Sequence, residues 1–398
     1  MAMPQNNLTT FNFTTLWFGA AISVAEILAG GLLAPLGFKM GVLAIILGHL
    51  VGTTLLVLAG IIGTEERIPA LVSTRISFGR YGSYAFSALN VLQLLGWTAI
   101  MIIAGARSVN QITSTLWSFD HLSIWSIIIG IFIFLWVLLG KDTGWKKANH
   151  IAVILLFLLT IVLSFILFRN HGLFTNQVVG EMSFGSALEL SVIMPLSWLP
   201  LISDYTRFAK TKKAGALGSW IGYFFGSCWM YIIGLGAAIA INNADPSAML
   251  LAANLGIVAL GIIILATVTT TFLDANSAGV TFANIFPKLN ERTVALAMTA
   301  IGTGLAIFIN IEAYQDFLYA IGSVFSPLFA ILLTDYFILK NKKVQEKLLI
   351  NWKSIAICVF GTFLYYQFIK LNFIAGATIP VMLITGIIHI ITWRLSVK

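Results

Sequence analysis

The chain has 398 residues, of which 59% are hydrophobic and only 10% are charged. Soluble globular domains carry about 25% charged residues, so this composition excludes an ordinary soluble protein and indicates an integral membrane protein. The net charge of +8 does not indicate a nucleic-acid partner, because the basic residues are placed as membrane-topology signals and contacts for anionic lipid headgroups.

Twelve membrane-spanning helices are predicted, because the apolar runs are continuous and reach the roughly 20 residues that a span requires. In chain order they cover residues 13–36, 40–63, 81–107, 122–140, 149–169, 185–208, 214–241, 255–286, 293–310, 313–339, 352–371 and 374–394. The N-terminal residues before the first run lack Lys and Arg, so we expect no cleavable signal peptide. Residues 1–398 are predicted to form a single membrane domain without a soluble module.

The positively charged residues give the predicted orientation. All but four of the 23 Lys and Arg residues fall on one side of the twelve-helix arrangement, the exceptions being Lys39, Arg107, Arg169 and Lys370. Basic residues are enriched in cytoplasmic loops. We therefore expect a multi-pass protein of the cytoplasmic membrane with both termini in the cytoplasm.

The first helix contains the stretch ISVAEILAGG, in which Glu26 is the only charge of a run from Leu16 to Leu36. A charge within lipid costs about 3 kcal/mol, so we expect Glu26 and nearby Ser23 to face a cavity inside the bundle. Our hypothesis is that Glu26 binds a ligand in this cavity through an amino group or a protonated nitrogen, or exchanges a proton there. The alternative is a structural carboxylate bonded to a neighbouring helix. Gly30 and Gly31 favour close helix packing.

The second and third helices also carry polar residues. His49 in LGHLVG is interpreted as a packed, hydrogen-bonded histidine rather than a proton relay. In the LQLLGW stretch of the third helix, Gln93 and Trp97 are four residues apart and therefore share a face. An amide and a flat indole together suit a planar heterocycle, although a helix-bridging amide beside a core aromatic fits the spacing equally well.

The sixth helix is predicted to be broken at mid-membrane. In MPLSWLPLISDYTRF, Pro195 and Pro200 each remove a backbone donor, and Ser197 and Trp198 lie between them. Backbone groups freed at this depth are tolerated only where they line protein or a cavity.

Asp204 and Arg207 follow near the cytoplasmic end of the same helix and are predicted to form a structural or gating ion pair rather than to bind substrate.

The eighth helix contains ATVTTTFLDANSAG, where Thr269, Thr270 and Thr271 are followed by Asp274. Threonine hydroxyls commonly bond to their own helix, but oxygen ligands of this kind also suit a hard cation such as sodium. Asp274 is predicted to have a structural or gating role, in preference to direct ligation. The irregular first and sixth helices are five apart, which is typical of transporters with inverted repeats. The first repeat is expected at 13–169 and the second at 185–339, with two additional helices at 352–394.

The chain resembles the nucleobase–cation symport family of purine, cytosine, allantoin and hydantoin permeases over nearly its whole length. The motifs that carry the resemblance are AGG in the first helix, RISFGRYGSY before the third, LQLLGW within it, ISDYTRF ending the sixth and SAGVTFANIF ending the eighth. The stretch LWFGAAISVAEILAGGLLAPLGF is most similar to the hydroxymethylpyrimidine permease branch, which is associated with salvage of thiamin precursors.

This resemblance implies an all-α LeuT-like fold and a sodium-coupled importer of a pyrimidine. The implied sodium ligands are the carbonyls of Gly19, Ile22 and Ala266 and the hydroxyls of Thr269 and Thr270. The implied substrate site has the indoles of Trp97 and Trp198 and the polar groups of Ser23, Gln93, Ser197 and Asn276. For such a pyrimidine, the hypothesis for Glu26 is that it binds the 4-amino group or the protonated ring nitrogen, or exchanges a proton during transport. No other cofactor and no catalytic residue is expected. A proton-coupled permease for cytosine, purines or another nucleobase is the alternative.

The chain departs from the family pattern at several positions. Met101 stands where hydantoin permeases have a glutamine, Gln93 precedes its tryptophan by four residues rather than the three of cytosine permeases, and Glu26 and Asp274 have no counterpart in the cytosine pattern. These differences favour a differently substituted pyrimidine over cytosine itself. An intramembrane enzyme is disfavoured because the nucleophile and metal motifs are missing, and a channel because the polar groups gather at one depth.

Overall fold

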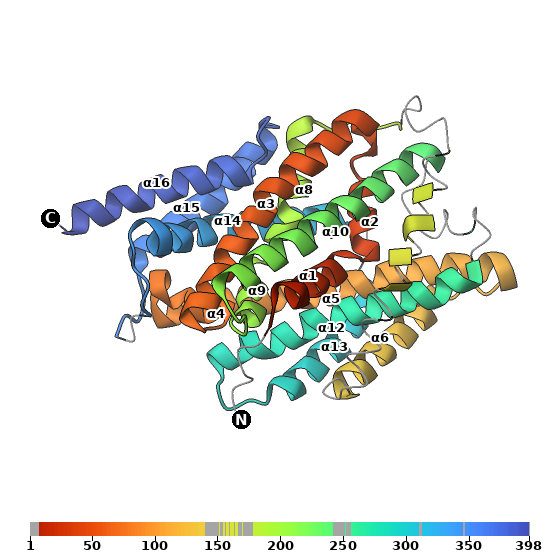
Figure 1. The fold of residues 1–398 in the computed structure, drawn as a ribbon, viewed down its shortest axis with the longest axis horizontal. Coiled ribbons are helices and arrows are strands. Elements are labelled where there is room, and N and C mark those ends of the chain that lie inside the picture. The colour runs from red at the N-terminus through yellow and green to blue at the C-terminus, as the bar shows by residue number, and fades with distance from the viewer. Residues whose placement is uncertain are drawn as a thin grey trace.

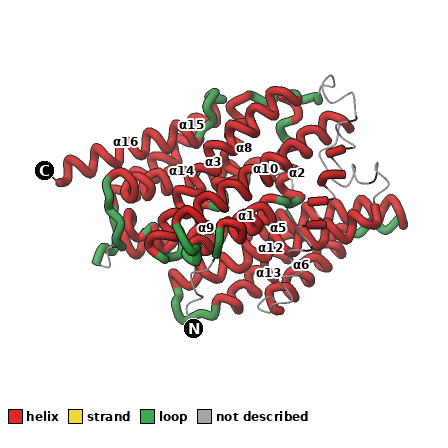
Figure 2. The backbone as a smooth tube through the Cα atoms, in the orientation of Figure 1, coloured by secondary structure: helices red, strands yellow, loops and turns green. Residues whose placement is uncertain are grey.

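The computed structural model describes residues 8–139, 178–241, 256–309, 313–344 and 347–397, with residue 251 and scattered positions between 151 and 169. These ranges form a helical bundle that contains no β-sheet (Figure 1, Figure 2). The helices are α1 (Thr10–Ala21), α2 (Val24–Gly31), the short η1 (Ala34–Leu36), α3 (Phe38–Glu66), α4 (Ala70–Ser73), α5 (Arg75–Trp117), α6 (Leu122–Leu139), α8 (Phe184–Leu196), α9 (Leu199–Thr206), α10 (Lys212–Ile241), α12 (Gly256–Ile285), α13 (Glu291–Phe308), α14 (Tyr314–Leu333), the π turn η4 (Thr334–Ile338), α15 (Trp352–Lys370) and α16 (Thr378–Val397).

Nine spans in the described ranges are long and apolar enough to cross a membrane, and the bent pair α1–α2 brings the number to ten. Together, α8 and α9 count as one of the nine, Phe184–Thr206. The helix predicted near 352–371 is present as α15, but it is not among the ten. The helix predicted at 149–169 lies largely outside the described residues. The chain is therefore a multi-pass membrane protein, as its composition predicts.

The first span is interrupted at its middle. Helix α1 ends at Ala21, α2 begins at Val24, and the two axes differ by 58°. Ser23 caps α2, with its Oγ accepting a hydrogen bond from the Glu26 N–H at 3.4 Å. Serine at this position satisfies one of the donors that a helix start leaves without a partner. Gly30 packs directly on the backbone of Tyr231, so its role is close packing rather than the break itself.

The sixth span is interrupted more mildly. Helix α8 ends at Leu196, one residue after Pro195, and α9 begins at Leu199 with Pro200 in its first turn. The Ser197 carbonyl at this interruption accepts a hydrogen bond from Gln93 Nε2 of α5 at 2.7 Å. The two prolines thus break the helix where the sequence predicts, and a side chain of another helix satisfies a freed backbone group.

The third span is longer than predicted, because α5 continues from Arg75 to Trp117 instead of covering only 81–107. Near its start, Gly79 has a φ of +76°, and its neighbours pair with a distant loop through Arg80 N–H to Leu348 O and Tyr81 N–H to Leu349 O. At the other end, α5 continues beyond Arg107 to Trp117 through polar residues. The prediction ended the helix at the end of the apolar run, but polar residues can continue a helix.

The interrupted first span lies at the centre of the bundle (Figure 1). Helix α1 packs mainly on α10, α3 packs on α8 and α10, and α5 packs on α12, while α15 and α16 lie at the outer edge beside α14. Both interruptions are therefore surrounded by other spans.

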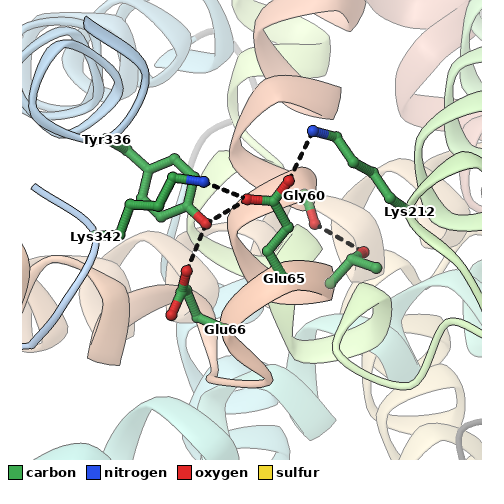
Figure 3. Close-up of polar contacts among 7 residues, drawn as sticks. Gly60, Glu65, Glu66, Lys212, Tyr336 and Lys342 are labelled. Carbon is green, nitrogen blue, oxygen red and sulfur yellow. Dashed lines mark hydrogen bonds and ion pairs between the residues drawn. The ribbon is translucent and has the colours of Figure 1, made fainter. Parts of the chain in front are cut away.

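One end of the bundle, which we call the basic end, joins the end of α3 to the start of α10 and the end of α14 (Figure 3). Glu65 binds Lys212 at 2.7 Å and Lys342 at 2.9 Å, and the Tyr336 hydroxyl lies 2.7 Å from Glu65 and 2.6 Å from Glu66. Three of the basic connections that were predicted to share a side of the membrane, those after α3, before α10 and after α14, thus meet at one end of the molecule.

Candidate functional site

A small cavity lies where the interrupted first span faces the sixth, third and eighth spans. Its volume is about 20 Å³, which is room for about one water molecule. The lining residues come from α1, α2, α5, α8, α12 and the break between α8 and α9, and they are Ala20, Ser23, Ala25, Glu26, Trp97, Met101, Met194, Trp198, Thr270 and Asp274. Two indoles and two carboxylates thus share one chamber.

Two tryptophans form the aromatic part of this wall. Trp97 packs edge-on against Phe317 at 5.4 Å between ring centroids, and Trp198 packs edge-on against Trp17 at 5.5 Å. Edge-to-face contacts fix the indole planes through ring quadrupoles. The supporting residue Trp17 was not predicted from the sequence, although it lies about one turn before the break.

The Glu26 carboxylate is buried and bonded to α10. Its Oε1 accepts a hydrogen bond from the Tyr223 hydroxyl at 2.9 Å, and its Oε2 lies 2.6 Å from Ser227 Oγ. These contacts fit the structural alternative that the sequence left open, yet the same side chain also reaches the cavity wall. Sequence reasoning did not identify Tyr223 or Ser227, because nothing local in α10 indicates which face meets α2.

Asp274 lies in the cavity wall, one turn after Thr270 on α12. It is only 4% exposed, and no hydrogen bond or ion pair joins its carboxylate to another of the described residues. The prediction gave this residue a structural or gating role, whereas the structure places it beside the indoles. A buried carboxylate without a partner is costly, so the site is suited to a ligand that supplies N–H donors.

Three of the predicted substrate-binding residues do not line the cavity. Gln93 bonds the Ser197 carbonyl, the helix-bridging alternative, and Ser197 Oγ bonds Met194 O of its own helix at 2.7 Å. Asn276 is exposed. The i to i+2 spacing from Asp274 turns Asn276 to a different face of α12.

The residues implied as sodium ligands lie at the junction of α1 with α12. Ile22 and Ala266 are buried in the same apolar cluster. The Ser23 N–H donates to Ala21 O, so the Gly19 carbonyl lacks its helical partner. Thr269 Oγ1 donates to Ala266 O at 3.1 Å, and Thr270 Oγ1 is buried without a hydrogen-bond partner in the described part of the chain. This combination of carbonyl and hydroxyl oxygens fits a hard cation.

The predicted ion pair of Asp204 with Arg207 does not form, since no such contact within 4 Å joins them in the described residues. Instead, Asp204 Oδ1 accepts from the Ala70 N–H at 3.0 Å, and Arg207 Nε donates to the backbone carbonyl of Asp204 at 3.2 Å. The guanidinium packs over the Phe208 ring. The helix ends at Thr206, so the two side chains are not held on one helical face.

Known proteins similar to this chain are permeases. Residues 4–390 match the family described as "Permease for cytosine/purines, uracil, thiamine, allantoin". The cytosine permease of Escherichia coli (strain K12) is 23% identical over 374 residues, which cover 87% of this chain and 83% of that protein. The hydantoin permease of Microbacterium maritypicum is 22% identical over 419 residues, covering 95% and 85%.

Solved structures share the fold. The inward-facing conformation of Mhp1 superposes with a TM-score of 0.81 at 20% identity, covering 98% of this chain and 92% of that one. A sodium-coupled sialic acid symporter superposes with a TM-score of 0.68 at 10% identity, covering 97% and 89%. The predicted all-α membrane fold of the LeuT-like type is confirmed.

Proposed function

The chain belongs to the family of permeases for cytosine and purines, uracil, thiamine and allantoin, and from this premise we propose that it is a secondary transporter that imports a 4-aminopyrimidine with sodium. Cytosine and hydroxymethylpyrimidine both belong to this substrate class. The proposed orientation places the basic end and both termini in the cytoplasm, because basic residues favour that side.

The single observation that carries the substrate class is the carboxylate of Asp274, which lines the same cavity as two indoles and has no hydrogen bond or ion pair within the described residues. An aminopyrimidine ring can stack on Trp97 or Trp198 while its amino group donates to Asp274. Uracil has a carbonyl where cytosine has the amino group, so it would place an acceptor against a carboxylate. The proposed site therefore favours cytosine over uracil, because only the amino group of cytosine can donate to Asp274.

Sodium is proposed to bind between α1 and α12, at the carbonyls of Gly19, Ile22 and Ala266 and the hydroxyls of Thr269 and Thr270. A cation there would order the break in the first span, from which Ser23 and Glu26 reach the cavity. Each ligand would then raise the affinity for the other by the same factor. Movement of one group of helices against the rest would expose the cavity to either side.

The test is equilibrium binding to the purified full chain in detergent. Cytosine, hydroxymethylpyrimidine, uracil and hydantoin are titrated in sodium buffer and in potassium buffer. We expect cytosine or hydroxymethylpyrimidine to bind more tightly than uracil, and sodium to strengthen the binding. Tighter binding of uracil or hydantoin would overturn the aminopyrimidine assignment, and equal affinities in both buffers would overturn sodium coupling.

A further inference from the structure

Behind Glu26, the cavity wall continues into a chain of three side chains from three helices. Ser227 Oγ of α10 lies 2.6 Å from Glu26 Oε2 and 2.6 Å from His49 Nε2 of α3. The other ring nitrogen of His49, Nδ1, lies 2.9 Å from the Ile45 carbonyl. All three residues are at most 2% exposed, and of the three only Glu26 lines the cavity.

Counting donors shows how many protons this chain needs. A carbonyl only accepts, so His49 Nδ1 carries a hydrogen. The Ser227 hydroxyl has one hydrogen but makes two short contacts, one to Glu26 and one to His49. Both contacts are hydrogen bonds only if one further proton is present, either on Glu26 Oε2 or on His49 Nε2.

The other proton counts do not fit the geometry. Without the extra proton, two acceptors lie 2.6 Å from a hydroxyl that can donate to only one of them. With a proton on both Glu26 and His49, the serine accepts twice and its own hydrogen has no acceptor. The arrangement therefore fits one shared proton. Losing this proton, or gaining a second one, would leave a buried polar group without a hydrogen-bond partner.

The side chains that surround this chain of three in the described residues include no other positive charge. No Lys or Arg forms an ion pair with Glu26 in the ranges that the structure describes. The titratable groups that face the chain are Asp274 from α12, Tyr314 from α14, and Tyr223, Cys228 and Tyr231 from α10, while α5 and α8 contribute only Trp97, Met101 and Met194 to the shared wall. These neighbours are neutral or acidic, so a proton is the cation available to balance Glu26.

We propose that Glu26, Ser227 and His49 form a proton-binding site, and that its single proton is exchanged with water in the cavity when α2 moves away from α10 during transport. The proton enters or leaves at Glu26 Oε2, and the Ser227 hydroxyl reorients between Glu26 and His49 as it does so. This inference rests on the proposed transport function and adds a second coupling ion to it.

The first test uses the full chain in proteoliposomes with equal sodium concentrations on both sides, an imposed pH gradient and labelled cytosine. For one proton per substrate, each pH unit should support about tenfold accumulation. Ser227→Ala cuts the link to His49, so the ratio of gradient-driven accumulation to cytosine exchange should fall several-fold. Tyr223→Phe is the matched control, because it removes the other hydroxyl on the same carboxylate and should preserve that ratio. Ser227→Thr restores the hydroxyl and should restore the ratio.

Three outcomes separate this inference from the proposed function. If the wild type exchanges cytosine but does not respond to the pH gradient, the proton site is overturned and the transport function stands. If Ser227→Ala and Tyr223→Phe lower the ratio equally, the link to His49 is overturned. If neither cytosine nor hydroxymethylpyrimidine is exchanged, the proposed function is overturned.

A second measurement needs no substrate. Alkaline pH removes the shared proton from the wild type, whereas the amide of Glu26→Gln supplies its own hydrogen to Ser227. A folded state that holds more protons than the unfolded state loses stability as pH rises. The melting temperature of the wild type should therefore fall more steeply at alkaline pH than that of Glu26→Gln, and parallel curves would overturn the site.

Discussion

Two glutamates, Glu189 and Glu26, lie deep in the bundle, and they differ in the kind of hydrogen-bond donors that surround their carboxyl groups. Glu189 of α8 accepts four hydrogen bonds at 2.7–2.8 Å, from the Tyr365 hydroxyl, the Thr378 hydroxyl and the N–H groups of Ala377 and Thr378. The last two are at the start of α16, where a helix favours a negative charge. Glu26 has only hydroxyl partners, and one of them is shared with a histidine.

The number and kind of donors explain the difference. Backbone N–H groups cannot turn away or accept, so two of the four donors to Glu189 are fixed in place. Hydroxyl groups can reorient, so Glu26 can change its protonation and its partners. A carboxylate held by fixed donors joins helices, whereas one held by rotatable donors beside a cavity can take part in transport.

The largest expected effect is the loss of Glu189. Glu189→Ala leaves two buried N–H groups and two hydroxyls without an acceptor, and we expect a loss of about 4 kcal/mol of stability. Glu26→Ala should cost about half as much, because its hydroxyl partners can find other acceptors. Thermal unfolding of the purified variants in detergent checks both values. Equal losses for the two variants would remove the distinction between fixed and rotatable donors.

Asp274 extends the comparison to a carboxylate that has no hydrogen-bond or ion-pair partner among the described residues. In Asp274→Asn, the amide no longer provides a charged acceptor, so the affinity for an aminopyrimidine should fall about 10- to 100-fold. The melting temperature should hold or rise, because a buried charge is removed. Isothermal titration with cytosine and hydroxymethylpyrimidine measures the affinity. A variant that binds as tightly as the wild type would exclude contact between Asp274 and the substrate.

Thr270 and Thr271 form a matched pair for the sodium proposal. The Thr271 hydroxyl donates to Thr267 O of its own helix at 2.6 Å, whereas the buried Thr270 hydroxyl has no such bond. Thr270→Ala should weaken the sodium stimulation of binding about tenfold, a typical coupling energy being 1–3 kcal/mol. Thr271→Ala should leave the stimulation intact. Titrating sodium at a fixed cytosine concentration checks this, and an identical response of both variants would count against the ligand set.

The smallest effect is expected at Arg207. Because its side chain bonds a backbone carbonyl and packs on Phe208, Arg207→Gln should change stability by less than about 1 kcal/mol. Asp204→Ala should cost more, since it frees the buried Ala70 N–H. Melting temperatures of the two variants decide this, and a large loss for Arg207→Gln would restore the ion pair as the stabilising contact.

Local sequence chemistry predicted the parts of the site that depend on neighbouring residues. Paired prolines indicated the break in the sixth span, and a lone glutamate among apolar residues indicated the irregular first span. Trp97 and Trp198, which were predicted to bind substrate, both line the cavity. Each of these signals lies within one helix, where spacing alone fixes the face that a residue occupies.

The missed contacts depend on which helices meet. The partners Glu189 and Thr378 are 189 residues apart, and Glu26 and Ser227 are 201 residues apart. No periodicity within α10 or α16 indicates these partners. Glu189 itself carried the same signal as Glu26, a single charge within an apolar run, and could have been singled out on that ground. The prediction of an ion pair between Asp204 and Arg207 was wrong, because residue spacing places two side chains on one face only where the helix continues.

The contacts of Glu65 with Lys212 and Lys342 affect how coupling must be measured. Both lysine side chains are about half exposed, at 54% and 43%, so dissolved salt weakens these ion pairs and each contributes less than about 1 kcal/mol. Adding sodium chloride would loosen this end of the bundle even without any specific sodium site. Titrations of sodium must therefore exchange it for potassium at constant ionic strength, or screening at Glu65 will be mistaken for ion coupling in the membrane.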